Sequence, residues 1–276
     1  SERHNLALLE QCEANLRQIG GTLRLLQIPG AALLADEMRM LCGAILKSIN
    51  AVPEGRLNAL STAFFVLPRY LEFVQSRQSE IPQLVIAHVN ELRAAHNQLL
   101  LPDSYFSQSD ESLFSRDSNI RIQGTPLAET AFIENLKRIN HLYQSGLLGL
   151  LRDAHNPMQL TIMSRAIRRL RSTIEAGPQQ RFWLLADALL EAFVNNGLEL
   201  NPHRKRVLAG LEGQMRARLK NRMVINEVLE RELCFLLSLS AYKEGLVGKV
   251  VKVARIHAAD INDEQLKTLR GIMLGL

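Results

Sequence analysis

Hydrophobic residues recur every three or four positions along most of the chain, a period that predicts amphipathic helices. The first such stripe extends from Leu6 to Leu26, which corresponds to a helix of about five turns. Residues 27–30, Gln-Ile-Pro-Gly, predict a turn, and a second stripe extends from Leu34 to Ile49. The beginning of the chain therefore predicts a helical hairpin.

Two further helices are expected after this hairpin. Residues 57–74 form a third stripe that contains Pro68, and we expect this proline to kink or split the helix because it removes a backbone donor. Pro82 suits the first turn of a fourth helix, whose apolar positions extend to Leu99. Because each narrow stripe must be covered by the other helices, the sequence predicts an antiparallel bundle over residues 1–100.

The helical period is lost between residues 101 and 125. This stretch, LPDSYFSQSDESLFSRDSNIRIQGT, has six serines between Pro102 and Ser118 and only a few aromatic residues. We predict a serine-rich linker or surface loop here, either a tether or an epitope.

A second helical unit is expected over residues 126–276. Its first two helices carry stripes over 132–150 and 160–174. A third is predicted at 179–196, with Asn196-Gly197 as its C-cap.

The last part of the chain predicts four more helices, at 203–221, 223–243, 246–257 and 262–274. The stretch 246–257 is rich in valine, so a short strand at 250–253 is the alternative there. The predicted fold class is all-α, with two helical bundles in tandem.

The composition is that of an ordinary globular protein, with 276 residues, 47% hydrophobic and 22% charged. The longest apolar runs, such as 31–35 and 64–67, are far below the roughly 18 residues that span a bilayer. No signal sequence opens the chain, so we expect a cytoplasmic protein without membrane insertion. Because the chain begins with Ser and stops within the apolar GIMLGL, we expect it to be a piece of a longer protein.

The common catalytic motifs are absent from the sequence, which has no GxGxxG, GxxxxGK[ST], GxSxG or HExxH. Its seven histidines never lie three or four residues apart, so no helix presents a two-histidine metal face. Cys12, Cys42 and Cys234 are far apart among aliphatic neighbours and predict buried, reduced thiols. We predict a protein with no catalytic site, cofactor or metal, and a catalytic set assembled from distant residues is the alternative.

Acidic residues occur in pairs on two of the predicted helices. Asp36-Glu37 and Glu230/Glu232 are the examples, and we interpret both pairs as solvated helix faces.

The segment LRQIGGTLRLLQIPGAALLADEMRML, residues 16–41, resembles the helical hairpin of histidine phosphotransfer (HPt) domains. In those domains a phosphorylatable histidine is followed by a Lys-Gly-small triplet, and Gly21-Thr22 match its last two residues. The histidine position is then Arg17 and the lysine position is Gly20, so both chemical groups are missing. Arginine cannot serve as the nucleophile because its guanidinium group stays protonated.

A second resemblance covers residues 181–220 and 228–241. These stretches are similar to the N-terminal region of the FimL/ChpA family, which comprises the chemotaxis-like histidine kinase of type IV pili and its shorter non-kinase relatives. The residues that carry it are Phe182-Trp183, Glu191 and the Gly-Leu-Glu-Leu turn at 197–200. In that family several HPt-like bundles follow one another, and some lack the histidine.

This resemblance implies two degenerate HPt-like bundles that act as a scaffold or adaptor in a pilus chemosensory pathway. The implied partners are the receiver domain of a response regulator and a polar pilus hub protein such as FimV, with effects on twitching motility and cyclic AMP signalling. A position at the cell pole would come through a partner, and a homodimer is a further option. The expected binding residues are Arg17, Gly20, Gly21 and Arg24, because two arginines seven residues apart would place positive charge opposite the acidic pocket of a receiver. The alternative is a solvated helix surface.

The net charge of +5 comes with two basic clusters. Their members are Arg165, Arg168, Arg169 and Arg171, followed by Arg204, Lys205, Arg206, Arg216, Arg218, Lys220 and Arg222. Such clusters could bind phosphates or an acidic protein, but aromatic residues do not interleave with them, and Glu191, Glu199 and Glu212 lie nearby as ion-pair partners. We therefore expect no nucleic-acid partner. A helical nucleic-acid or acidic-protein binding module and an active phosphotransfer protein remain the alternative functions.

Overall fold

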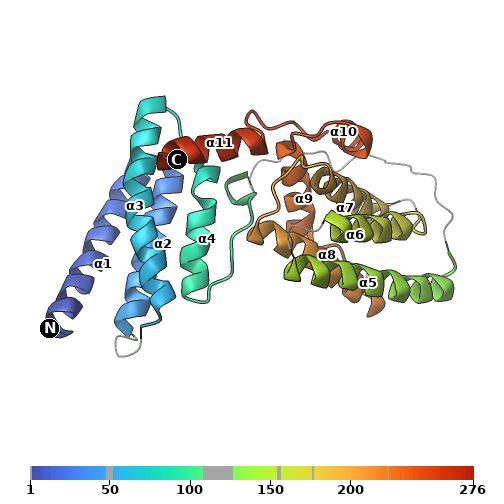
Figure 1. Ribbon diagram of the computed structural model, residues 1–276, viewed down its shortest axis with the longest axis horizontal. Helices are drawn as coiled ribbons and strands as arrows, with labels where there is room; N and C mark the ends of the chain where they lie inside the picture. Colours follow the sequence, from blue (N-terminus) through green and yellow to red (C-terminus); the bar gives the residue numbers. More distant parts are fainter. Residues whose placement is uncertain (1, 48–51, 108–126, 154–156, 176, 223) are drawn as a thin grey trace. The chain divides into compact units, whose positions relative to one another are not determined.

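The computed structural model describes residues 2–47, 52–107, 127–153, 157–175, 177–222 and 224–276 (Figure 1). Within these ranges every regular element is helical and no strand occurs, which confirms the all-α class. The chain divides into two compact units. Unit 1 comprises the residues up to 102 together with 266–276, and unit 2 comprises residues 103–265.

Unit 1 begins with the predicted hairpin. Helix α1 (Glu2–Leu25) and helix α2 (Pro29–Lys47) pack along each other. Between them Gln27 takes the left-handed backbone conformation, with φ of 58°, and the amide of Ile28 donates to the carbonyl of Leu23. This bond closes α1, and α2 then starts at Pro29, where the missing amide of proline costs nothing.

Helices α3 (Glu54–Arg77) and α4 (Ile86–Ala95) complete the described bundle, with the short 3-10 helix η2 (Pro82–Leu84) before α4. Helix α3 continues through Pro68, so the expected split does not occur. Helix α4 ends before Leu99, which is 83% exposed. Its earlier end follows from Asn97, whose φ of 60° takes the backbone out of the helix.

Helix α2 lies at the centre of unit 1 and contacts α1, α3 and α4. Its apolar positions Leu34, Met38, Leu41 and Ile45 are therefore almost fully buried. The N-terminus of α2 is capped from another element: the carboxylate of Glu80 accepts the amide of Gly30 at 2.8 Å and the hydroxyl of Tyr70 at 2.9 Å.

Unit 2 contains the longer series of helices. In chain order these are η3 (Tyr105–Ser107), α5 (Glu129–Arg152), α6 (Pro157–Arg171), α7 (Pro178–Val194), α8 (Pro202–Leu219), α9 (Glu227–Leu239), α10 (Gly245–Val253) and the first turn of α11 (Asp263–Leu274). The valine-rich stretch is thus helical, and the alternative of a strand at 250–253 is wrong.

Helix α7 forms the core of unit 2, where it packs against α6, α9 and α10. It ends through Asn196, whose φ of 54° supplies the left-handed residue that we expected at the Asn196-Gly197 cap. Gly197 has a different role, because a Cβ there would lie 2.4 Å from the Cβ of Tyr242. The glycine allows the chain at 240–242 to approach, and the amide of Ala241 donates to its carbonyl at 2.8 Å.

Two of the acidic residues that we interpreted as solvated are buried instead. Glu37 is 2% exposed and pairs with Arg93, and its Oε2 lies 3.8 Å from Nε2 of His96. Glu232 is 4% exposed. The interpretation of solvated faces was wrong for these two positions because their partners come from distant parts of the sequence.

Glu232 anchors the beginning of the predicted linker in unit 2. Its two carboxylate oxygens accept the amides of Asp103 at 2.9 Å and Ser104 at 3.0 Å. Ser104 is 3% exposed, so this part of the stretch is held in the structure and is no free tether. Residues 108–125 of the predicted linker lie outside the described residues.

Candidate functional site

The predicted binding residues lie on one side of α1. Arg17 and Arg24, two helical turns apart, both line a hollow of about 610 Å³ on unit 1. Helix α2 supplies the rest of its wall: Leu33, Asp36, Glu37, Arg39 and Met40. We call Arg17, Arg24, Leu33, Asp36, Arg39 and Met40 the α1–α2 face.

Positive charge prevails on the α1–α2 face. Nη2 of Arg17 lies 3.4 Å from Oε1 of Glu13, and Nη1 of Arg39 lies 3.7 Å from the same oxygen. Arg24 pairs with Asp36. Three guanidinium groups therefore share two carboxylates. The side chain of Arg17 is 71% exposed, so its ion pair with Glu13 is weak. Arg17 can exchange this pair for one with a partner's carboxylate at little cost in free energy.

The two glycines of the motif have different surroundings. A Cβ at Gly20 would lie 3.0 Å from Oδ1 of Asp36, so this glycine allows α1 and the Asp36 carboxylate to pack closely. A Cβ at Gly21 would meet no atom within 4 Å. Gly21 therefore borders open space one turn from Arg17, which leaves room for a partner.

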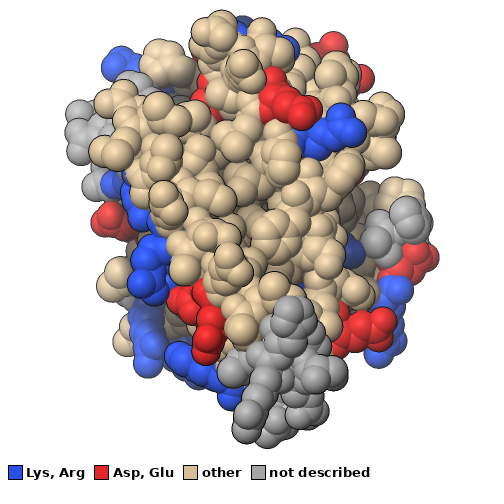
Figure 2. Space-filling model, turned by 90° about the vertical axis from the view of Figure 1, so that its left-hand side faces the viewer, with Lys and Arg blue, Asp and Glu red and all other residues tan. Residues whose placement is uncertain are grey.

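Unit 1 has a second surface, on which exposed side chains are apolar. On α1, Leu8 and Ile19 are 51% and 40% exposed, and on α3, Leu57 and Phe64 are 46% and 45% exposed. Figure 2 shows that uncharged side chains cover the middle of the face over these helices, while Lys, Arg, Asp and Glu gather at its edges. Exposed apolar side chains inside a polar rim are typical of protein contact surfaces.

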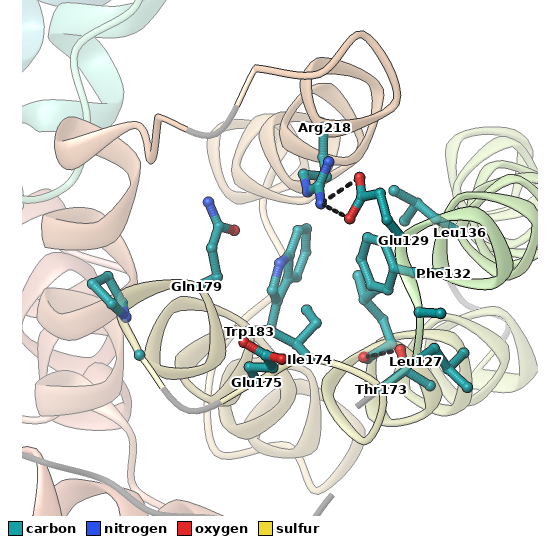
Figure 3. Close-up of a pocket in the computed structure, with 14 residues that line it drawn as sticks. Leu127, Glu129, Phe132, Leu136, Thr173, Ile174, Glu175, Gln179, Trp183 and Arg218 are labelled. Atoms are coloured by element: carbon teal, nitrogen blue, oxygen red, sulfur yellow. Dashed lines mark hydrogen bonds and ion pairs between the residues drawn. The ribbon is translucent and has the colours of Figure 1, made fainter. Parts of the chain in front are cut away.

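A pocket of about 470 Å³ lies in unit 2 (Figure 3). Trp183 of α7 and Phe132 of α5 point into it, and Leu136 and Ile174 add apolar wall. At its mouth Nη2 of Arg218 donates to both carboxylate oxygens of Glu129 at 3.0 Å. The guanidinium group also lies over the Phe132 ring, 5.0 Å from its centroid.

The described lining of this pocket is mostly apolar, which suits the binding of an apolar group. Its described lining residues include no histidine, cysteine or serine, and two of its three charged side chains, Arg218 and Glu129, pair with each other, while Glu175 is the third. A volume of this size lies in the range of pockets for small ligands or single side chains.

Comparison with known proteins assigns this second unit to a family. Residues 128–266 match the sequence profile described as "FimL scaffold protein second domain". The chain belongs to the FimL scaffold protein family. It is also similar to the "Scaffold protein FimL" of Pseudomonas aeruginosa strain PAO1, with 33% identity over 246 residues, which is 87% of this chain.

The chain spans about 42% of the length of that FimL relative. The FimL second-domain profile lies within unit 2, apart from its last residue, and covers the pocket from Ala128 to Arg218. The α1–α2 face lies outside the profile. No solved structure matches the chain.

Both basic clusters of this FimL homologue contain arginines that pair with acidic residues. Nε of Arg171 lies 3.1 Å and Nε of Arg168 lies 3.8 Å from oxygens of the fully buried Asp187. Arg216 pairs with Glu212 at 2.8 Å, as we expected for that carboxylate. Glu191 instead accepts the amide of Val247 at 2.9 Å.

Sequence reasoning did not find the α2 side of the α1–α2 face. Leu33, Asp36, Arg39 and Met40 reach it from α2, and the HPt motif gives no signal for them. It also did not bring Cys12 and Cys42 together, whose sulfurs lie 3.7 Å apart. In the described ranges no three His, Cys, Asp or Glu side chains are grouped to hold a metal, and no helix there has the length and hydropathy to cross a membrane.

Proposed function

We propose that this FimL homologue is a non-catalytic adaptor of a type IV pilus chemosensory pathway, which docks the receiver domain of a response regulator on its α1–α2 face. The observation that carries the proposal is the place of Arg17. It stands, 71% exposed, beside a hollow that combines two apolar side chains, Leu33 and Met40, with an excess of guanidinium groups.

The physical argument is one of complementarity. A receiver presents an acidic pocket, and phosphotransfer domains meet it with a histidine that enters this pocket. An arginine at that position removes the reaction, because it cannot accept the phosphoryl group, but it adds a permanent charge of the sign that the pocket attracts. Leu33 and Met40 add the apolar area that such an interface buries.

The remaining parts of the proposal follow from the family resemblance. Units 1 and 2 act as two degenerate HPt-like bundles, and unit 2 engages a polar pilus hub protein such as FimV. The adaptor works in the cytoplasm, at the pole through that partner, and influences twitching motility and cyclic AMP signalling. The pocket at Trp183 supports a role of unit 2 in protein contacts, because an apolar side chain of a partner would fit its volume.

The proposal is tested by titrating the chain with the fluorescently labelled receiver domain of the pathway's response regulator at two salt concentrations. Arg17→Glu is compared with Arg165→Glu, which makes the same charge change on an exposed residue of α6. We expect saturable binding by the wild type and by Arg165→Glu, and at least about tenfold weaker binding by Arg17→Glu at low salt. Equal binding by all three proteins, or no binding, would contradict it.

One observation bears on an active phosphotransfer protein. His141 is exposed on α5, and the sequence HLYQSG places a glycine five residues after it, one residue later than in the motif. However, a Cβ at this glycine, Gly146, would lie 2.7 Å from Cγ of Met163, so Gly146 packs against α6 and leaves no room for a partner. Incubation with the phosphorylated receiver tests this alternative: an acid-labile label that is lost in His141→Gln would establish it.

A further inference from the structure

Two cysteines that are thirty residues apart in sequence meet inside unit 1. Sγ of Cys12, on α1, lies 3.7 Å from Sγ of Cys42, on α2. The two helices pack along each other, so this contact is held by the hairpin itself. Both cysteines are free thiols.

The surroundings of the two sulfurs differ. Cys42 is fully buried, whereas Cys12 is partly exposed at the surface of α1. The third cysteine, Cys234, is 1% exposed and belongs to unit 2. Among the described side chains no metal-ligating group joins the pair, so the arrangement is one of two thiols alone.

We propose that Cys12 and Cys42 are an oxidative modification site, which hydrogen peroxide converts into an intramolecular disulfide between α1 and α2. Two sulfurs in van der Waals contact need only small side-chain rotations to reach bonding distance. A disulfide requires two such thiols and an oxidant that takes two electrons, which the peroxide supplies.

The reaction proceeds in two balanced steps. The thiolate of Cys12, which the oxidant can reach, attacks one peroxide oxygen; the O–O bond breaks, and the departing hydroxide takes up a proton to become water. This leaves a sulfenic acid on Cys12. The sulfur of Cys42 then attacks the sulfur of Cys12; the S–S bond forms, the S–O bond breaks, and the hydroxide leaves as water with the proton of Cys42.

The order of the steps follows from burial. Burial raises the pKa of Cys42 to about 12, and the neighbouring Cys12 adds to the rise. Cys42 therefore keeps its proton at neutral pH and acts second, when the sulfenic acid on Cys12 provides an electrophile in direct contact.

The disulfide would fasten the hairpin close to the α1–α2 face. Glu13, the residue after Cys12, provides the carboxylate that lies next to both Arg17 and Arg39. A covalent link at position 12 fixes this part of α1 on α2. It also constrains the unfolded chain, so we expect oxidation to raise the midpoint of thermal unfolding.

The test treats the reduced chain with hydrogen peroxide and follows its intact mass, its tryptic peptides and its thermal unfolding. We expect the loss of two hydrogen atoms, a linked peptide pair that contains residues 12 and 42, reversal by dithiothreitol, and a higher unfolding midpoint for the oxidised form. Cys234→Ala should behave as the wild type does. Cys12→Ala, at the more exposed position and so the variant more certain to fold, should lose both the link and the shift in midpoint.

Three results would overturn the proposal. The first is the addition of oxygen to Cys12 without a link to Cys42. The second is a disulfide between two chains or one that involves Cys234. The third is the absence of a link between Cys12 and Cys42 after peroxide treatment, with both cysteines still alkylated once the chain is unfolded.

Discussion

Arg204 and Asp263 lie side by side in unit 2, with two guanidinium nitrogens facing two carboxylate oxygens. Nη1 donates to Oδ2 at 2.8 Å and Nη2 donates to Oδ1 at 2.5 Å. Nε of Arg204 donates to Asp103 at 2.9 Å. A single buried guanidinium group therefore joins α8, the start of α11 and the chain just before η3. Burial opposes the charged form, but the hydrogen bonds to Asp263 and Asp103 outweigh it and raise the pKa of Arg204.

Removal of this guanidinium group should strongly destabilise unit 2. Arg204→Met leaves Asp103 and Asp263 without their shared cation, and breaking a buried ion pair from one side costs about 3–5 kcal/mol. Urea unfolding followed by the fluorescence of Trp183, the single tryptophan, measures the loss. Arg206→Met, an exposed neighbour on α8, serves as the control and should change the free energy of unfolding by less than about 0.5 kcal/mol. Similar values for the two variants would contradict the assigned role.

Glu232 should give the stability of unit 2 a dependence on pH. Burial raises the pKa of Glu232 above its ordinary value of 4.5, and the charge of Asp103 adds to the rise. The folded state then holds a proton that the unfolded state has lost, so the free energy of unfolding falls as pH rises from 4.5 to the raised pKa.

Glu232→Gln removes the titrating group and should show a smaller fall over this interval. Urea unfolding of both proteins at a series of pH values measures the two slopes. The raised pKa of Asp187 contributes equally to both and cancels in the comparison. Equal slopes for the two proteins would show that Glu232 does not titrate in this way.

Two glycines in helices of unit 2 should respond to alanine in opposite directions. A Cβ at Gly146 would lie 2.7 Å from Cγ of Met163 and 3.2 Å from the carbonyl oxygen of Gln159. Gly146→Ala should therefore force α5 and α6 apart and destabilise the protein by about 1–3 kcal/mol. A Cβ at Gly213 would meet no atom within 4 Å, so Gly213→Ala should stabilise α8 by about 0.5–1 kcal/mol. Thermal unfolding compares the two, and a loss of stability in both would contradict the distinction.

The sequence predicted the helices because their signal is local. The stripe at Leu34, Met38, Leu41 and Ile45 needs only the helical period, and the structure buries all four. Pro68 shows the limit of a local rule, since α3 continues through it while packed on its neighbours.

The failures concern pairs of residues that are distant in sequence. The sequence around Glu37 is that of an ordinary exposed helix, and its partner Arg93 comes from α4. The sequence around Glu232 likewise gives no signal for its hydrogen bonds with the amides of residues 103 and 104. For the same reason the motif located Arg17 and Arg24, whereas the α2 side of the face could be found only from the packing of α1 on α2. The contact between Cys12 and Cys42 depends on that same packing.

The central claim, that the α1–α2 face docks a receiver domain, is tested most directly by hydrogen exchange of the whole chain with and without that domain. The account predicts slower exchange of the amides around Arg17 to Arg24 on α1 and Leu33 to Met40 on α2. The amides of α6 should exchange as before. Protection confined to unit 2, or to the uncharged face over α1 and α3, would contradict the claim and place the partner elsewhere.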